Sequence, residues 1–361
     1  MRRSPFLPAV ASALVPALVL VACASHDDGA LARPAGTDDG GPPPGSASPD
    51  DESSEVDTAD QPTVGADGVG DPYYPMLGNG GYDVRHYDLV LDWQPDDGRL
   101  DGVVTIEATA TQALSRFNLD FGDLEITSAD VDGEPATTER EGDHELVVTP
   151  AEPLDDGADF TVEIAYGGEV EPQPGLLSGL GGWVDDGEEV YVASQPDGAH
   201  AFYPVNDHPS DKATYTITVT APEDLDVVAN GVERTGPDGP EAAPGSGDGT
   251  RTWEFEVTEP MASYLLQVVV ANLEFEVDES PGGVAIRHAH DEDVRDEAAA
   301  ALRDTGEMID FFAERFGPYP FPVYGGVTVD EDLGFALETQ TLSIFPAGVN
   351  SEVVAHELAH Q

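Results

Sequence analysis

The sequence predicts a mainly β protein: a large antiparallel saddle or sandwich, followed by the start of a mixed α/β domain. Three observations support this fold class. Segments with alternating apolar and polar residues recur through residues 82–270, which is typical of strands with one buried face. Turns rich in Gly, Asp and Pro separate these segments at short intervals. After about residue 281, apolar residues at helical spacing replace the alternation.

The N-terminus is typical of an export signal. Arg2 and Arg3 precede an apolar segment, residues 6–21, which is too short and too often interrupted by Pro to span a membrane comfortably. The segment ends in Leu-Val-Ala-Cys, which resembles the lipobox of bacterial lipoproteins. We therefore expect residues 1–23 to be a lipoprotein signal peptide and Cys23 to be lipidated, which places the protein on the outer face of the bacterial cell membrane. Cys23 is the single cysteine in the sequence, as fits an exported protein without disulfides; the alternative is a plain signal peptide with an incidental Cys.

The next segment, residues 24–73, contains almost nothing to bury. It is rich in Pro, Gly, Ser and acidic residues, so we expect a disordered acidic tether. The whole sequence has 14 Lys and Arg against 72 Asp and Glu, a net charge of −58. Such a surface repels nucleic acid and anionic lipid, so we expect no nucleic-acid partner and contact with the membrane through the lipid anchor only.

Residues 74–280 are expected to form the β region. Its alternating segments predict strands, and a longer apolar run at residues 264–270 predicts a buried strand. A segment rich in Gly and Pro, residues 236–249, predicts an exposed loop. The other predicted strands are residues 82–93, 102–108, 145–149, 160–166, 213–220 and 252–257.

Residues 281–361 are expected to form the α/β part. Apolar residues at helical spacing predict one helix over residues 293–316, which ends at a Gly-Pro-Tyr-Pro segment, residues 317–320. Short strands are predicted at residues 327–329 and 342–345. A final helix is predicted to begin at Asn350 or Ser351, since either side chain can cap it.

This last helix carries His356-Glu357-Leu358-Ala359-His360, the His-Glu-x-x-His pattern of zinc peptidases. Residues four apart share one helix face, so His356 and His360 can bind one zinc ion. Glu357 is then placed to accept a proton from a metal-bound water. The alternative is an ordinary amphipathic helix on which two His happen to share a face.

Glu338 lies eighteen residues before His356, between two predicted strands. A carboxylate beside a metal ion can pair with the free α-ammonium group of a peptide, which would make the enzyme act from the N-terminus. The alternative is a surface glutamate at a strand edge.

Several segments together resemble the aminopeptidase N family of zinc metallopeptidases. Residues 334–339, Gly-Phe-Ala-Leu-Glu-Thr, are similar to the family's Gly-Ala-Met-Glu-Asn motif, and residues 204–213 are similar to its Pro-Cys-x-Asp-x-Pro-x-x-Lys-Ala signature. Residues 316–321 and 356–361 also fit. The resemblance implies a β-saddle N-terminal domain followed by a thermolysin-like catalytic domain. It further implies a one-zinc aminopeptidase that removes N-terminal amino acids from peptides.

The resemblance also implies roles for single residues. Glu338 would bind the substrate ammonium, within a substrate-binding motif that includes Gly334 and Ala336; at its last position this chain has Thr339 where the family has Asn. A second ammonium-binding residue is expected at Asp197, with Gln195 as the other candidate. The alternative is a plain turn, because Pro-Asp-Gly favours one.

The family's third zinc ligand, a Glu nineteen positions after the second His, would lie beyond Gln361. We therefore expect the 361 residues to be a fragment that by itself binds zinc poorly and has little activity. Two other functions remain open: a non-catalytic cell-surface binding lipoprotein, and a zinc endopeptidase.

Overall fold

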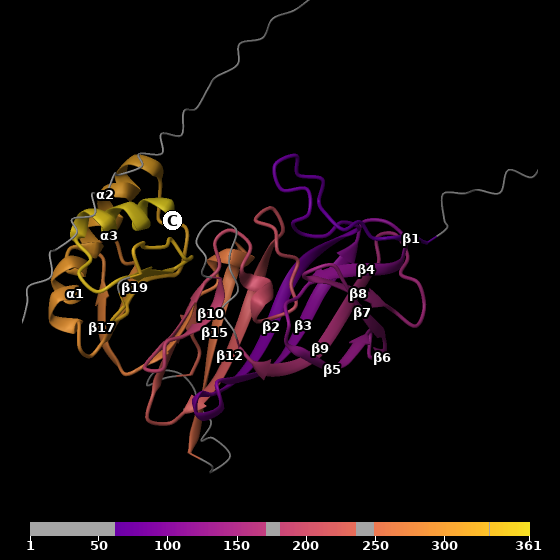
Figure 1. Ribbon diagram of the computed structural model, residues 1–361. Coiled ribbons are helices and arrows are strands. Elements are labelled where there is room, and N and C mark those ends of the chain that lie inside the picture. The colour runs from indigo at the N-terminus through magenta and orange to yellow at the C-terminus, as the bar shows by residue number, and fades with distance from the viewer. Residues whose placement is uncertain (1–61, 171–180, 236–248, 332) are drawn as a thin grey trace, which may run out of the picture. The chain divides into compact units, whose positions relative to one another are not determined.

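The computed structural model describes residues 62–170, 181–235, 249–331 and 333–361. The expected signal peptide with Cys23, most of the expected tether and nearly all of the 236–249 loop lie outside these residues. The described residues belong to one compact unit, and strands dominate it (Figure 1). Among them, no helix has both the length and the apolar character that crossing a membrane requires.

The largest sheet in the described part of the chain has eight strands, in the order β14-β15-β12-β2-β3-β9-β5-β6. Its neighbours are antiparallel except for β2 and β12, which run parallel. Alternate residues of the long strands are buried, as the sequence pattern predicts. The strands are β2 (Tyr82–Gln94), β3 (Arg99–Ala110), β5 (Glu125–Val131), β6 (Glu134–Pro135), β9 (Asp159–Glu169), β12 (Lys212–Pro222), β14 (Val232–Glu233) and β15 (Thr250–Ala262).

Two smaller sheets, β1-β4-β8-β7 and β10-β11-β16-β13, share a hydrophobic core with the large sheet. Ring contacts cross this core: the ring centroids of Tyr82 and Phe117 lie 5.6 Å apart. The strands are β1 (Thr63–Val64), β4 (Leu114–Asp120), β7 (Thr137–Glu141), β8 (Glu145–Thr149), β10 (Gly182–Asp185), β11 (Val190–Ala193), β13 (Asp226–Ala229) and β16 (Val268–Ala271). Short 3-10 helices lie at η2 (Pro95–Asp97), η3 (Ala199–Ala201) and η4 (Ser263–Leu265).

A fourth sheet, in the order β17-β18-β19-β20, carries the helices (Figure 1). Strands β18, β19 and β20 are parallel, and β17 is antiparallel to β18. Helix α1 packs on β18 and β19, and α3 packs on α1 and α2. The elements are β17 (Leu273–Glu279), β18 (Ala285–Asp291), β19 (Val323–Thr328), β20 (Leu342–Phe345), α1 (Arg295–Leu302), α2 (Thr305–Phe316) and α3 (Ser351–His360).

The structure corrects two of the predicted elements. The helix expected over residues 293–316 is broken between α1 and α2, because the hydroxyl of Thr305 donates to the carbonyl of Leu302 (2.6 Å) and satisfies the end of α1. The strand expected at residues 264–270 begins only at Val268, after the 3-10 turn η4. Both corrections replace a regular element by a turn that redirects the chain.

The fourth sheet begins before residue 281. Strand β17 already belongs to it, so the expected boundary at residues 280 and 281 falls within the turn between β17 and β18. The change of sheet lies instead between β16 and β17. The sequence pattern does not indicate this change of sheet, because only Asn272 separates the two strands.

A second hydrophobic core joins this sheet to β10, β11, β13 and β16. A partly buried ion pair adds to the connection: Arg287 on β18 donates to Glu233 (3.1 Å) and to the carbonyl of Ala229 (3.0 Å). Pairing the charge of a largely buried arginine offsets part of the cost of burying it. The mainly β fold class predicted from the sequence is confirmed.

Candidate metal centre and substrate site

Helix α3 begins where the sequence predicts. Of the two candidate caps, Asn350 is the one used: its side-chain oxygen accepts from the backbone N–H groups of Glu352 (2.9 Å) and Val353 (3.2 Å). Val354 and Leu358 are buried toward the protein interior. This orientation leaves the opposite face of the helix, with both His of the motif, exposed.

The two imidazoles lie side by side on that face. The Nε2 atoms of His356 and His360 are 3.2 Å apart. Two nitrogen ligands at about 2.0–2.1 Å from a tetrahedral zinc ion are expected to lie about 3.3 Å apart. The donor pair therefore fits zinc, with the remaining ligands to come from outside it.

Glu357 lies beside the imidazoles and is only 6% exposed. One of its carboxylate oxygens lies within 4.8 Å of ligand nitrogens on both His. Burial raises the pKa of Glu357; the positive charge available on His356 and His360 opposes the shift, and the negative charge of Glu338 adds to it. The arrangement provides a shielded base next to the place where a metal ion fits.

Glu338 connects three separate segments of the chain. Its Oε1 accepts from the side-chain amide of Gln195 (3.1 Å), just after β11, and from the hydroxyl of Tyr264 (3.2 Å) in η4. Burial, and then the charge of Glu338, raise the pKa of Tyr264 to about 12, so the phenol remains a donor at neutral pH. This half-buried carboxylate is held in place by neutral groups, with its charge available for a cation.

The loop that carries Glu338 is fixed along its length. Leu337 exchanges two backbone hydrogen bonds with Ile344 of β20, both 3.1 Å. On the other side, the N–H of Gly231 donates to the hydroxyl of Thr341 (2.7 Å), and the Asn230 side chain donates to the carbonyl of Gln340. Thr341 is a β-branched residue at φ +65°, a strained conformation that only well-defined surroundings maintain.

The neighbouring motif residues have different environments. Gly334 is exposed and adopts φ +70°, a left-handed conformation that favours glycine. Ala336 is half-buried and packs against Phe345 and its neighbours. Thr339, where the resembling family has Asn, is fully buried, and its hydroxyl donates to the carbonyl of Leu342. In this chain the threonine closes the turn before β20.

The side chain of Gln361 connects the end of helix α3 to the loop that carries Glu338. Its side-chain NH2 donates to the carbonyls of Glu338 (3.0 Å) and Thr339 (3.4 Å), and its side-chain oxygen accepts from the N–H of Thr341 (2.8 Å). These three hydrogen bonds help to fix the position of the two His relative to Glu338. Sequence reasoning missed it, although it directly follows the second His.

Replacing Gln361 with Leu removes these three hydrogen bonds while keeping an apolar side chain of similar length. We expect a loss of about 1–3 kcal/mol in the free energy of unfolding and faster hydrogen exchange of the Thr341 amide. Gln361→Glu retains the acceptor for Thr341 and is the matched control, with Thr341 exchange close to that of the wild type. Unchanged exchange in Gln361→Leu would contradict the role given to this residue.

The segment of residues 204–213 helps to hold the turn that carries Tyr264, through contacts of Asp207. Asp207 is buried; it accepts from the hydroxyl of Ser263 (2.7 Å) and from the backbone N–H of His200 (3.0 Å). Ser263 is the first residue of η4, so Asp207 fixes the turn that presents Tyr264 to Glu338. Burial lowers the pKa of His200, but the hydrogen bond to Asp207 and its charge outweigh this effect and raise it.

The structure places the two candidates for a second ammonium-binding residue differently. Gln195 is exposed and reaches Glu338. Asp197 is 7% exposed. Burial lowers the pKa of His144, and the charge of Asp197 opposes that shift. Among the described residues, Gln195 is thus the one seen next to Glu338.

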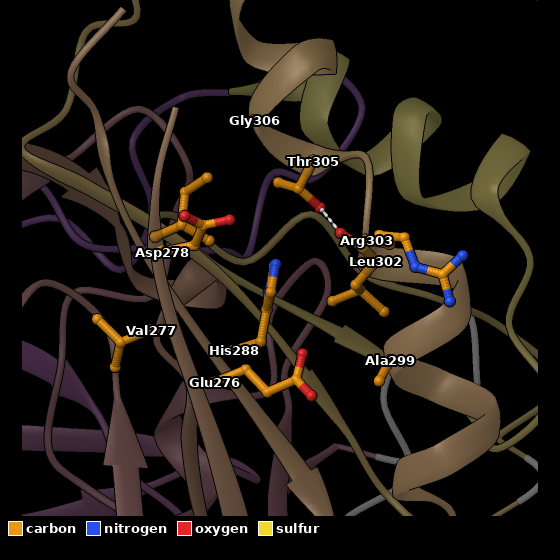
Figure 2. Close-up of a pocket in the computed structure, with 10 residues that line it drawn as sticks. Glu276, Val277, Asp278, His288, Ala299, Leu302, Arg303, Thr305 and Gly306 are labelled. Carbon is orange, nitrogen blue, oxygen red and sulfur yellow. Dashed lines mark hydrogen bonds between the residues drawn. The ribbon is translucent and has the colours of Figure 1, made fainter. Parts of the chain in front are cut away.

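His288 and His290 lie within β18, and both are buried. His288 borders a cavity of about 470 Å³ with Glu276 and Arg303 around it (Figure 2). Burial, and then His290, lower its pKa to about 3, and its Nδ1 accepts from the N–H of Gly326 (2.9 Å). His288 is a neutral structural residue, and this cavity is lined by neither His of the metal motif.

Residues 84–265 match the sequence profile of the peptidase M1 N-terminal domain. Aminopeptidase N of Canis lupus familiaris is 28% identical over 239 residues, which are 60% of this chain and 24% of that protein. A probable M1 family aminopeptidase 2 of Encephalitozoon cuniculi is 27% identical over 342 residues, 79% of this chain and 37% of that protein. The chain thus spans about a quarter to a third of the length of these relatives.

Solved structures give the same result. The M1 zinc metallopeptidase from Deinococcus radiodurans superposes with a TM-score of 0.72 at 32% identity, covering 81% of this chain and 66% of that one. A mutant of that enzyme bound to a Tyr-Ser-Ala substrate superposes with a TM-score of 0.73 at 31% identity. The similarity therefore extends past the matched N-terminal domain into the part of the chain that carries the metal motif.

Proposed function

Because the chain belongs to the peptidase M1 family, we propose that it supplies the N-terminal domain and the zinc motif of an aminopeptidase that removes N-terminal amino acids from peptides. One observation carries the proposal: Glu338 is held by Gln195 and Tyr264, and Gln361 ties its loop to the helix of His356 and His360. A carboxylate fixed beside a metal-binding helix suits a substrate that brings a positive charge next to its scissile bond.

His356 and His360 would hold the zinc ion, together with ligands from outside this pair. When bound, zinc supplies Lewis-acid activation of a water molecule and of the scissile carbonyl. Glu357 accepts the proton that the attacking water loses and passes it to the departing amine. Its burial keeps solvent from competing for that proton.

Glu338 binds the α-ammonium group of the substrate, and the side-chain oxygen of Gln195 adds a second acceptor. Tyr264 keeps the carboxylate oriented through its hydroxyl. Because the ammonium must sit at Glu338, only the peptide bond that follows the first residue reaches Glu357. This geometry accounts for cleavage from the N-terminus.

The proposal is tested by zinc analysis and turnover. The product of the complete reading frame is expected to contain one zinc ion and to release the amino acid from an aminoacyl reporter, with both lost in His356→Ala. The 361-residue chain is measured beside it, and we expect little zinc and little turnover from it. A zinc-free, inactive product of the complete reading frame would instead indicate a binding protein.

We also propose that the protein is exported and anchored to the outer face of the cell membrane through lipidated Cys23. The lipobox-like sequence before Cys23 and the acidic tether after it support this. Replacing Cys23 with Ser is expected to move the protein from the membrane fraction to the soluble fraction and to abolish labelling by a radioactive fatty acid. Retention in the membrane after this change would contradict the anchor.

A further inference from the structure

An acidic cavity lies where the hairpin β10–β11 meets the ends of β18 and β19. The two strands are parallel and in register at His290 and Thr328, so the loops that follow them lie next to each other. Asp291 is the last residue of β18, Asp293 follows it, and Asp330 follows β19. One carboxylate oxygen of each lies within 4.8 Å of the others. The cavity has a volume of about 330 Å³.

Glu189, from the turn of the hairpin, is the buried member of this cavity. It is 4% exposed, and neither of its carboxylate oxygens has a hydrogen-bond partner among the described residues. The backbone N–H of Asp330 faces the carboxyl group and acts to lower its pKa. Buried carboxylates are normally paired, so an unpaired one that borders a cavity indicates a missing positive charge.

The surroundings provide no such charge. The described residues that line the cavity are eight carboxylates and one amide, that of Asn272. Burial, followed by the negative charges of Asp186 and Asp291, raises the pKa of Glu189 to about 8. Burial and the neighbouring carboxylates, Asp330 first among them, also raise the pKa of Asp291, against the hydrogen bond from the N–H of Asp293. Every neighbouring side-chain charge is thus of the same sign.

We propose that Glu189, Asp291, Asp293 and Asp330 bind one calcium ion. Calcium takes six to eight oxygen ligands at about 2.3–2.6 Å and tolerates irregular geometry, so carboxylates from separate turns and strand ends suit it. Magnesium demands a near-ideal octahedron. Zinc prefers nitrogen and sulfur ligands, and no His or Cys lines the described part of this cavity.

The ion would connect two sheets close to the substrate site. Glu189 precedes β11, and β11 leads directly to Gln195, which donates to Glu338. Asp291 and Asp330 belong to the sheet whose edge carries the Glu338 loop. A calcium ion would therefore hold the hairpin that delivers Gln195 against the sheet that carries its partner. The inference concerns ion binding and does not depend on the proposed peptidase activity.

Thermal unfolding and calorimetric titration of the purified chain test the site. After dialysis against EGTA, CaCl2 at about 100 times its dissociation constant is expected to raise the melting temperature by about 5 °C more than MgCl2 at the same ionic strength. Titration is expected to show one calcium ion bound per chain.

Two variants remove a ligand each. Glu189→Gln is expected to weaken calcium binding at least about tenfold, because it lowers the negative charge of the ligand set. Asp293→Asn changes an exposed side chain, so it folds independently of the outcome for Glu189, and it is expected to weaken binding similarly. Glu163→Gln, which removes the same charge from an exposed position on β9, should keep the full calcium response.

Equal shifts with calcium and magnesium would overturn the proposal, because they would mean only screening of the acidic surface. An equal calcium response in Glu189→Gln, Asp293→Asn and the wild type would overturn it as well. The absence of a stoichiometric calcium site in the titration would do the same.

Discussion

Replacing Glu357 with Gln is expected to lower kcat by about 10²–10⁴-fold while zinc binding persists. A general base typically contributes this factor, and glutamine has the same shape but cannot accept the proton. The two imidazoles remain on their exposed face, since they do not depend on the charge of Glu357 for their position. The measurement is kcat for an aminoacyl reporter, together with zinc content, in the product of the complete reading frame.

Glu352→Gln is the matched control, because it makes the same chemical change in the first turn of the same helix at an exposed position. It is expected to leave kcat unchanged. If Glu357→Gln kept wild-type turnover with zinc bound, the assignment of Glu357 as the base would be wrong.

Replacing Glu338 with Gln is expected to lower kcat/KM by about 30-fold or more for substrates with a free N-terminus. Removing one partner of a desolvated charge pair typically costs about 2–5 kcal/mol, and each 1.4 kcal/mol is a factor of ten. The amide oxygen can still accept from Gln195 and Tyr264, so the loop should keep its position and the melting temperature should change little.

Comparing the loss of kcat/KM on free and acetylated substrates distinguishes a loss of ammonium binding from a general loss of activity. The preference of the enzyme for a free over an acetylated N-terminus should shrink in Glu338→Gln, because the acetylated substrate never used the charge. Gln195→Ala should show a smaller change in the same direction. Equal losses on both substrates would contradict the role of Glu338.

The metal helix was predictable because its information is local. The spacing of His356 and His360 and the cap at Asn350 follow from a few adjacent residues and the period of a helix. Helix propensity and the spacing of side chains on a helix depend on residues within a few positions of one another, which is also the range of the sequence pattern. The strands with alternating apolar and polar residues were predictable for the same reason.

The contacts that complete the site were not predictable from local pattern. Gln195 and Glu338 are 143 residues apart, and Tyr264 reaches Glu338 across 74 residues. The apolar run that contains Tyr264 predicts a strand, but the hydrogen bond from Ser263 to Asp207 fixes a 3-10 turn there instead. Tertiary contacts outweigh local propensity at this point.

The break between α1 and α2 illustrates the same limit at smaller scale. Apolar spacing continues across residues 303 and 304, so periodicity predicts one helix. The Thr305 hydroxyl ends the first helix by a side-chain-to-backbone bond that periodicity does not register. The acidic cavity around Glu189 could not be predicted from local pattern either, because its carboxylates come from a hairpin and two separate strand ends.

The central claim is that Glu338 makes this a peptidase that acts on free N-termini. The most direct test compares one peptide, free and N-acetylated, as substrates of the zinc-loaded product of the complete reading frame. We predict cleavage of the free peptide after its first residue and a kcat/KM at least about 30-fold lower for the acetylated one. Equal cleavage of both peptides, or cleavage at an internal bond, would contradict the account and indicate an endopeptidase.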